Sequence, residues 1–188
     1  MDYTSLLLPD VIAEAEAIAA DAERTFAALS PEQLNWKPDA SQWSVGQCLD
    51  HLIQTDSRIG AALDGVITDT KPSRFAERIP GLPGFFGRLM VKSLGPQVTR
   101  KMKAPAAATP AASDVPADVV IRFLANHDQT IERMRALESK HPERAIITSP
   151  FAGVVVYSAL DACRIVVAHD RRHMAQAERV MGLPEFPR

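Results

Sequence analysis

Apolar residues recur at intervals of three and four along four separate stretches of the chain. Spacing of this kind is typical of amphipathic α-helices that bury one face. The first stretch runs from about residue 9 to residue 29 and ends near Ser30 and Pro31. The second opens at Ser44, which forms with Gln47 the S-x-x-Q pattern of a capping box. Two long helices are therefore expected in the first third of the chain.

The other two stretches lie in the second half of the chain. A third helix is expected to start near residues 113–116 and to bury the stripe Val120, Leu124, His127, Ile131 and Met134. The fourth is expected to begin at Ser158 and Asp161, which can cap it, and to stop at Gly182, a residue that tolerates the left-handed conformation. The strand-like run VVVY (154–157) has no partner of similar character, so we expect no sheet.

Prolines separate the two pairs of helices. They occur at positions 72, 80, 83, 96, 105 and 110, so residues 70–112 are predicted to be mostly irregular, with a short helix around residues 85–93. The run AAATPAAS is predicted to be an extended crossover that can cover one end of the molecule. The pattern as a whole predicts an all-α protein, a single four-helix-bundle domain over residues 1–188 with a long proline-rich crossover.

Composition and charge narrow the classes of partner. The chain has 46% hydrophobic and 23% charged residues and a net charge of −2, with no basic block or basic–aromatic stripe, so we expect no nucleic-acid partner. Its N-terminus lacks a basic region, and no apolar run approaches the ~18 residues that span a bilayer. A cytoplasmic protein without a membrane partner is expected. Cys48 and Cys163 are interpreted as buried thiols.

Three histidines are the candidate metal-binding residues. His169 and His173 lie four residues apart in the last helix and therefore on one face of it. His51 lies on the flank of the second helix's apolar stripe, where it can look along the groove between helices. Three neutral imidazoles that meet at one point, with a fourth position left to water, suit a catalytic divalent metal ion. The alternative is a surface pair beside Arg171 and Arg172.

Further polar residues lie near these histidines in the predicted helices. Gln47 and Gln176 are each one turn from a candidate ligand and can orient it or bind a cofactor or substrate, although helix capping also explains Gln47. His127 is interpreted as a core histidine that donates to a carbonyl or lines a cavity, with a role as fourth metal ligand as the alternative. Cys48 is the other possible fourth ligand.

Two further features are not expected to take part in the candidate metal site. Asp170 follows His169 directly and so points ~100° away from it, which distinguishes HDRRH from the HExxH motif of metalloproteases. Trp36 and Trp43 flank the loop before the second helix and are expected to wedge the end of the bundle.

Three motifs in order resemble the DinB/YfiT-like superfamily of metalloenzymes. They are LNWKP, then WSVGQCLDHL, then AHDRRHMAQAERV, and the resemblance spans roughly residues 5–182. It implies an up-down-down-up four-helix bundle, often a homodimer, with a divalent metal ion, zinc or nickel, held by His51, His169 and His173. Better understood members are S-transferases or isomerases that use low-molecular-weight thiols such as bacillithiol or mycothiol.

Two functions are compatible with these residues. The first is an enzyme in which the metal ion activates a low-molecular-weight thiol for S-transfer to a small-molecule substrate, or water for hydrolysis. The sequence offers no obvious carboxylate base beside the histidines, which favours thiol activation. The alternative is a non-catalytic metal-binding protein, stress-linked or ligand-sensing, whose closed site would need a fourth protein ligand.

Overall fold

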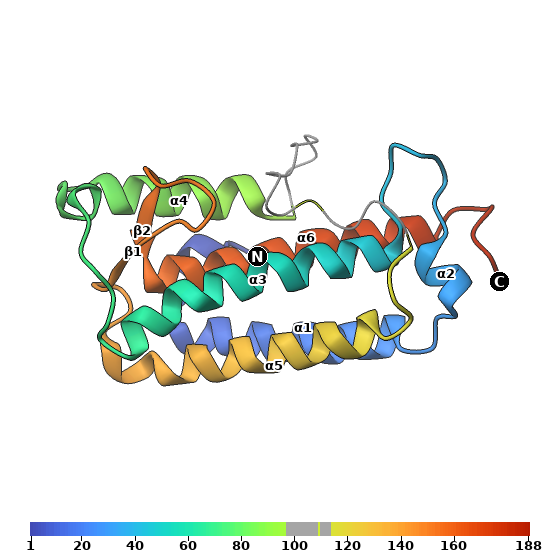
Figure 1. Cartoon of the computed structure of the whole chain (residues 1–188), viewed down its shortest axis with the longest axis horizontal. Coiled ribbons are helices and arrows are strands. Elements are labelled where there is room, and N and C mark those ends of the chain that lie inside the picture. Colours follow the sequence, from blue (N-terminus) through green and yellow to red (C-terminus); the bar gives the residue numbers. More distant parts are fainter. Residues whose placement is uncertain (97–108, 110–113) are drawn as a thin grey trace.

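Four long helices form a bundle in the computed structural model, which describes residues 1–96, 109 and 114–188 (Figure 1). Their bounds are Leu8–Phe26 for α1, Val45–Ile67 for α3, Val119–Ala136 for α5 and Ala159–Met181 for α6. Each corresponds to one of the four amphipathic stretches, so the predicted all-α fold is confirmed. Helices α1 and α6 run in one direction and α3 and α5 in the other, which is the up-down-down-up order (Figure 1).

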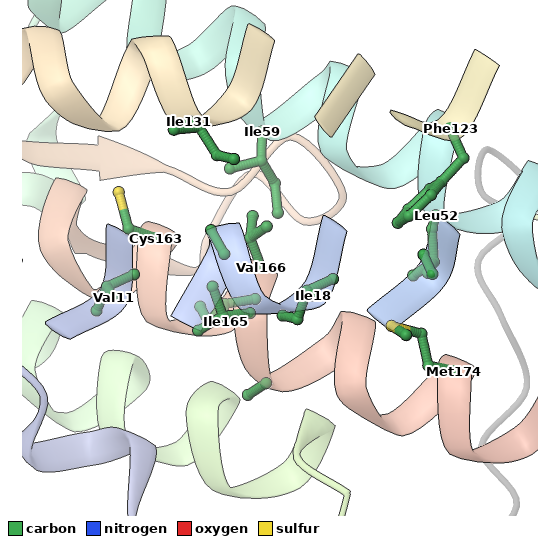
Figure 2. Close-up of a cluster of buried hydrophobic side chains, with 14 of the residues drawn as sticks. Val11, Ile18, Leu52, Ile59, Phe123, Ile131, Cys163, Ile165, Val166 and Met174 are labelled. Atoms are coloured by element: carbon green, nitrogen blue, oxygen red, sulfur yellow. The ribbon is translucent and has the colours of Figure 1, made fainter. Parts of the chain in front are cut away.

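The core lies between the four long helices. Helix α3 packs against both α5 and α6, and α1 packs against the same two helices from the other side. Figure 2 shows apolar side chains from all four helices meeting in this space. Among the fully buried ones are Ile18 of α1, Leu52 of α3, Phe123 of α5 and Val166 of α6. The α5 stripe differs by one residue from the prediction, because Phe123 is buried where Leu124 was expected and Leu124 is only partly so.

The long helices keep polar outer faces, as their amphipathic patterns require. Within the described ranges, no helix is long and apolar enough to cross a membrane.

Side-chain caps fix where the bundle helices begin. Ser44 Oγ accepts from the backbone N–H of Gln47 at 3.1 Å, and Gln47 Oε1 accepts from the backbone N–H of Ser44 at 3.2 Å. Ser158 Oγ accepts from the backbone N–H of Asp161 at 2.9 Å and so starts α6. Both predicted caps are confirmed. Gly182 ends α6, but at φ −79° and not in the left-handed conformation that was expected.

A second capping box explains a short helix that the sequence interpretation missed. Residues Pro31–Asn35 form α2, between the first two predicted helices, where no helix was expected. Ser30 and Gln33 cap it reciprocally, in the same way as the start of α3. Pro31 occupies the first turn, where its missing N–H costs nothing.

A small hairpin precedes α6. Strand β1 (Ile146–Thr148) pairs antiparallel with β2 (Val156–Ser158), so the prediction that the VVVY run has no partner was wrong. The partner strand is only three residues long and buries Ile147 alone, which gives almost no periodic signal in the sequence. Ser158 both ends β2 and caps α6, so the hairpin determines where α6 starts.

Helix α4 (Leu82–Leu94) covers the outside of the bundle, against β2 and α6. It confirms the short helix predicted around residues 85–93 and is preceded by a 3₁₀ turn, η2 (Phe75–Arg78). The predicted AAATPAAS crossover lies outside the described residues apart from Thr109. The third bundle helix, expected from residues 113–116, starts at Val119.

Helix α4 approaches α6 so closely at Gly87 that a side chain has no room there. A β-carbon at Gly87 would lie 2.2 Å from Asp161 Oδ2 and 2.7 Å from Asp161 Cγ. Asp161 is itself held by Arg164, whose Nη1 donates to Oδ1 at 2.8 Å. We expect Gly87→Ala to lower the free energy of unfolding by about 1–3 kcal/mol, because the two helices must separate or Asp161 must leave its partner.

The matched control for this change is Gly84→Ala in the same helix. There the nearest atom to an added β-carbon, Arg88 Nη1, is 3.7 Å away, so the substitution should be neutral or slightly stabilising. Urea denaturation of the two variants measures the difference. Equal stability of both would show that the α4–α6 contact tolerates a side chain.

Candidate metal centre

The three predicted histidines come together between α3 and α6. His51 Nε2 lies 3.3 Å from His169 Nε2, and one ring nitrogen from each of the three residues lies within 4.8 Å of the other two. The ring centroids are 5.0 Å apart for His51 and His169, 4.6 Å for His51 and His173, and 4.5 Å for His169 and His173. The interpretation of His169 and His173 as a surface pair is therefore wrong, because both face a third imidazole on another helix.

The surroundings of His169 and His173 favour the neutral form of these two imidazoles. The side chains of His51 and His173 are almost completely buried, whereas His169 is partly exposed. Burial first, and then the nearby His51 and Arg172, lower the pKa of His173 to about 3. Burial, together with His173 and His51, also holds the pKa of His169 well below its ordinary value. Neutral imidazole is the form that binds metal ions, so His169 and His173 need not lose a proton at neutral pH before they bind one.

Trp43 forms a wall of this histidine cluster. Its ring stacks on that of His173 with centroids 5.6 Å apart and an interplanar angle of 23°, and it is tilted over His51 at 4.9 Å. The sequence interpretation gave Trp43 only a wedging role at the bundle end and missed this contact. Trp36 does pack near the chain's C-terminus, edge-on to Phe186 at 5.6 Å.

The two glutamines differ in their relation to the cluster. Gln47 is buried and uses its Oε1 for the helix cap described above. Gln176 lies close enough to His173 to act on the pKa of that imidazole, in the direction that favours the protonated form. A cofactor-binding role for Gln47 or Gln176 stays a prediction.

Neither candidate for a fourth ligand joins the three histidines. His127 Nε2 lies 2.9 Å from the carbonyl oxygen of Ala15, to which it donates, as expected for a core histidine. Its other ring nitrogen belongs to a separate buried group, described next. Cys48 is fully buried, and burial raises the pKa of its thiol to about 12, so it stays protonated. Among the described residues, the group of donor atoms around the three histidines therefore includes no fourth protein ligand.

A second buried polar group lies between α3, α5 and α6. It consists of Asp56, His127 and Asp170, all three completely buried, with one donor atom from each within 4.8 Å of the others. Burial raises the pKa of Asp56, and burial together with Asp56 raises the pKa of Asp170 well above its usual range. As predicted, Asp170 does not face the same way as His169; it points into the core.

The sequence interpretation missed this group, although a signal for it exists. Asp56 lies four residues after Leu52 and three before Ile59, and Asp170 lies four after Val166 and four before Met174. Both aspartates therefore occupy positions on apolar stripes, where a charge is costly unless it has a partner.

Comparisons with known proteins assign the chain to a superfamily. Residues 14–177 match the sequence model of the DinB superfamily. A protein of Bacillus subtilis (strain 168) described as uncharacterized protein YuaE is 26% identical over 153 residues, which cover 81% of this chain and 85% of that protein. No solved structure matches the chain significantly. The matched region of the superfamily model includes all three histidines of the cluster.

Acidification tests how strongly the fold keeps His173 neutral. The unfolded chain has an imidazole pKa of about 6.5, whereas the pKa in the fold is about 3. Between these values only the unfolded chain binds the proton, so the free energy of unfolding falls as the pH falls. In the presence of a chelator, we expect wild type to lose about 1.4 kcal/mol more per pH unit than His173→Gln between pH 6 and pH 4. Urea denaturation across this range measures the loss, and parallel profiles would contradict the assignment.

Proposed function

Because the chain belongs to the DinB superfamily, we propose that it is a metal-dependent enzyme whose divalent ion is bound by His51, His169 and His173. We propose further that the enzyme activates a low-molecular-weight thiol for S-transfer to a small electrophile, with activation of water for hydrolysis as the second form of the same chemistry. The observation that carries the proposal is the meeting of three nitrogen donors within 4.8 Å. The surroundings of two of them, His169 and His173, favour neutral imidazole.

The donor set fits a divalent ion of the zinc or nickel type. Imidazole nitrogen is a preferred ligand of both metals. The Nδ1 atom of His173 is buried without a hydrogen-bond partner, so part of the polar surface of this ring is unsatisfied by the protein itself. Three neutral ligands leave the ion its full charge, and a bound thiol or water would therefore lose its proton near neutral pH.

The surrounding residues favour a thiolate over a water-derived nucleophile. In the described part of the chain, the group of donor atoms at the histidines contains no carboxylate that could take a proton from water. The positive charge of Arg172 acts on both His169 and His173 and would stabilise an anion bound beside them. The Trp43 ring excludes water from one side of the cluster.

Burial supports a second candidate function, a non-catalytic metal-binding or ligand-sensing role. His51 and His173 are 3% and 8% exposed, and His169 is the most exposed of the three histidines. An enzyme needs access for its substrate to this cluster, whereas a sensor would need access only for the metal ion or a small ligand. Small-molecule binding, a homodimer and a cytoplasmic location stay predictions.

Metal analysis of the untagged protein tests the site. We expect close to one equivalent of divalent metal at the histidine cluster, and its loss in His51→Ala, because removing a direct ligand should cost more than the 10–100-fold in affinity that outer-shell changes cost. The exposed His141 provides the control, and His141→Ala should keep the metal. An unchanged metal content in His51→Ala would refute the three-histidine site.

A panel of thiols tests the reaction. Metal-loaded protein is mixed with an electrophilic dye and each thiol in turn, and with ester substrates in the absence of thiol. We expect thiol-dependent dye conversion that falls at least about tenfold in His51→Ala. Hydrolysis without any thiol would favour water activation. If the metal binds but neither reaction occurs, the non-catalytic role is supported and the enzyme proposal fails.

A further inference from the structure

We propose that Asp56, His127 and Asp170 form a second divalent-cation site, buried in the bundle and separate from the three histidines. Each residue comes from a different helix: Asp56 from α3, His127 from α5 and Asp170 from α6. The proposal does not depend on the function proposed above, because it concerns different donor atoms and no reaction.

The hydrogen bonding of His127 leaves a lone pair directed at a carboxylate. Its Nε2 can only donate to the carbonyl oxygen of Ala15, 2.9 Å away, because a carbonyl has no proton to give. In the neutral ring the other nitrogen, Nδ1, is then an acceptor. That atom lies 3.3 Å from Asp170 Oδ2 and has no hydrogen-bond donor. Two acceptors thus face each other across a gap that needs a positive charge or a proton.

The two carboxylates add to the need for a positive charge or a proton in this group. Both oxygens of Asp170, and Oδ2 of Asp56, are buried and have no hydrogen-bond partner among the described residues. The other oxygen of Asp56 lies 3.5 Å from the Thr55 hydroxyl. Unpartnered carboxylates are rare in protein interiors because their desolvation is so costly.

Arg171, the cationic side chain whose charge acts on Asp170, forms its hydrogen bonds with other residues. Arg171 influences Asp170 only through its charge, since its Nε donates to Glu14 at 2.6 Å and its Nη1 to Asp21 at 2.5 Å. The face of the His127 ring is covered by the apolar ring of Phe123, with centroids 5.4 Å apart. When both carboxylates are ionised and the imidazole is neutral, the group carries a charge of −2, which one divalent ion would balance.

The donor types indicate the class of ion. Carboxylate oxygens with one imidazole nitrogen suit first-row divalent ions such as Mn²⁺ or Zn²⁺. Donors that share such an ion at bond lengths of about 2.0–2.2 Å lie at most about 4.4 Å apart, so small side-chain rotations would bring the present donors, within 4.8 Å of each other, into range. Because all three residues are closed to solvent, the ion would be structural.

The two sites share helices but not ligands. Asp56 follows His51 by five residues, about 7.5 Å along the axis of α3. Asp170 is adjacent to His169 in sequence, but its side chain points into the core and joins a different group of donors. Each site can therefore be removed without changing a ligand of the other.

Counting bound ions in single-site variants tests the proposal. Chelator-stripped full-length protein is incubated with Zn²⁺ or Mn²⁺, both natively and during refolding from urea, and metal is measured after equilibrium dialysis. The key variant is His51→Ala, in which the buried group is intact. We expect it to keep one equivalent of at least one of the two ions. No bound metal in either preparation would overturn the second site.

Asp56→Asn, which keeps the shape of the side chain, provides the complementary measurement. It should bind one equivalent fewer than wild type, while the exposed Asp128→Asn on α5 should bind as many as wild type. Equal binding by Asp56→Asn and wild type would mean that protons occupy the buried group, and would overturn the proposal. If wild type binds metal and His51→Ala binds none, the three-histidine site is supported and the second site is refuted. The two proposals can therefore fail separately.

Discussion

Burial of polar side chains by α6 is the constraint on which the rest of the structure depends. This helix carries His169, Asp170 and His173. It packs against α3, and its Asp170 lies 3.3 Å from His127 of α5. An ionisable group in a bundle interior is costly unless it meets a partner or loses its charge. The facing helices accordingly present His51, Asp56 and His127 at the matching heights. The burial of these polar side chains of α6 thus constrains both the packing of the bundle and the chemistry of the two groups.

The outer elements hold α6 in the position that this matching requires. The hairpin ends at Ser158, which caps the first turn of α6, and α4 packs on the same region through Gly87. At the other end, Trp43 precedes the first turn of α3 and stacks on the imidazole of His173. Both ends of α6 are fixed relative to α3, and so the histidines of the two helices stay close.

Periodicity and capping residues predicted most of the fold and the central part of the site. The apolar spacing defined the four long helices, and the flank position of His51 predicted that it would meet His169 and His173. Features that depend on contacts distant in sequence could not be predicted in this way. Strand β1 is too short to show a pattern, and the path of the loop that brings Trp43 onto His173 is not encoded by any local signal.

The Asp56–His127–Asp170 group could be predicted from the sequence only in part. Helix geometry predicted that Asp170 and His169 would point in different directions. A hydrogen bond from His127 to a backbone carbonyl was also predicted, although not which carbonyl. What these side chains would meet depended on how α3, α5 and α6 pack against one another, which local periodicity does not specify. Charged residues at apolar-stripe positions remain the sequence feature that indicates such groups.

Anomalous X-ray scattering from crystals of the full chain grown with zinc would test the central claim most directly. Data collected above and below the zinc edge locate the ion without assuming its ligands. A peak is expected about 2.0–2.1 Å from one ring nitrogen each of His51, His169 and His173. A map without a peak there, in zinc-saturated crystals whose three imidazoles bond only to one another or to water, would contradict it.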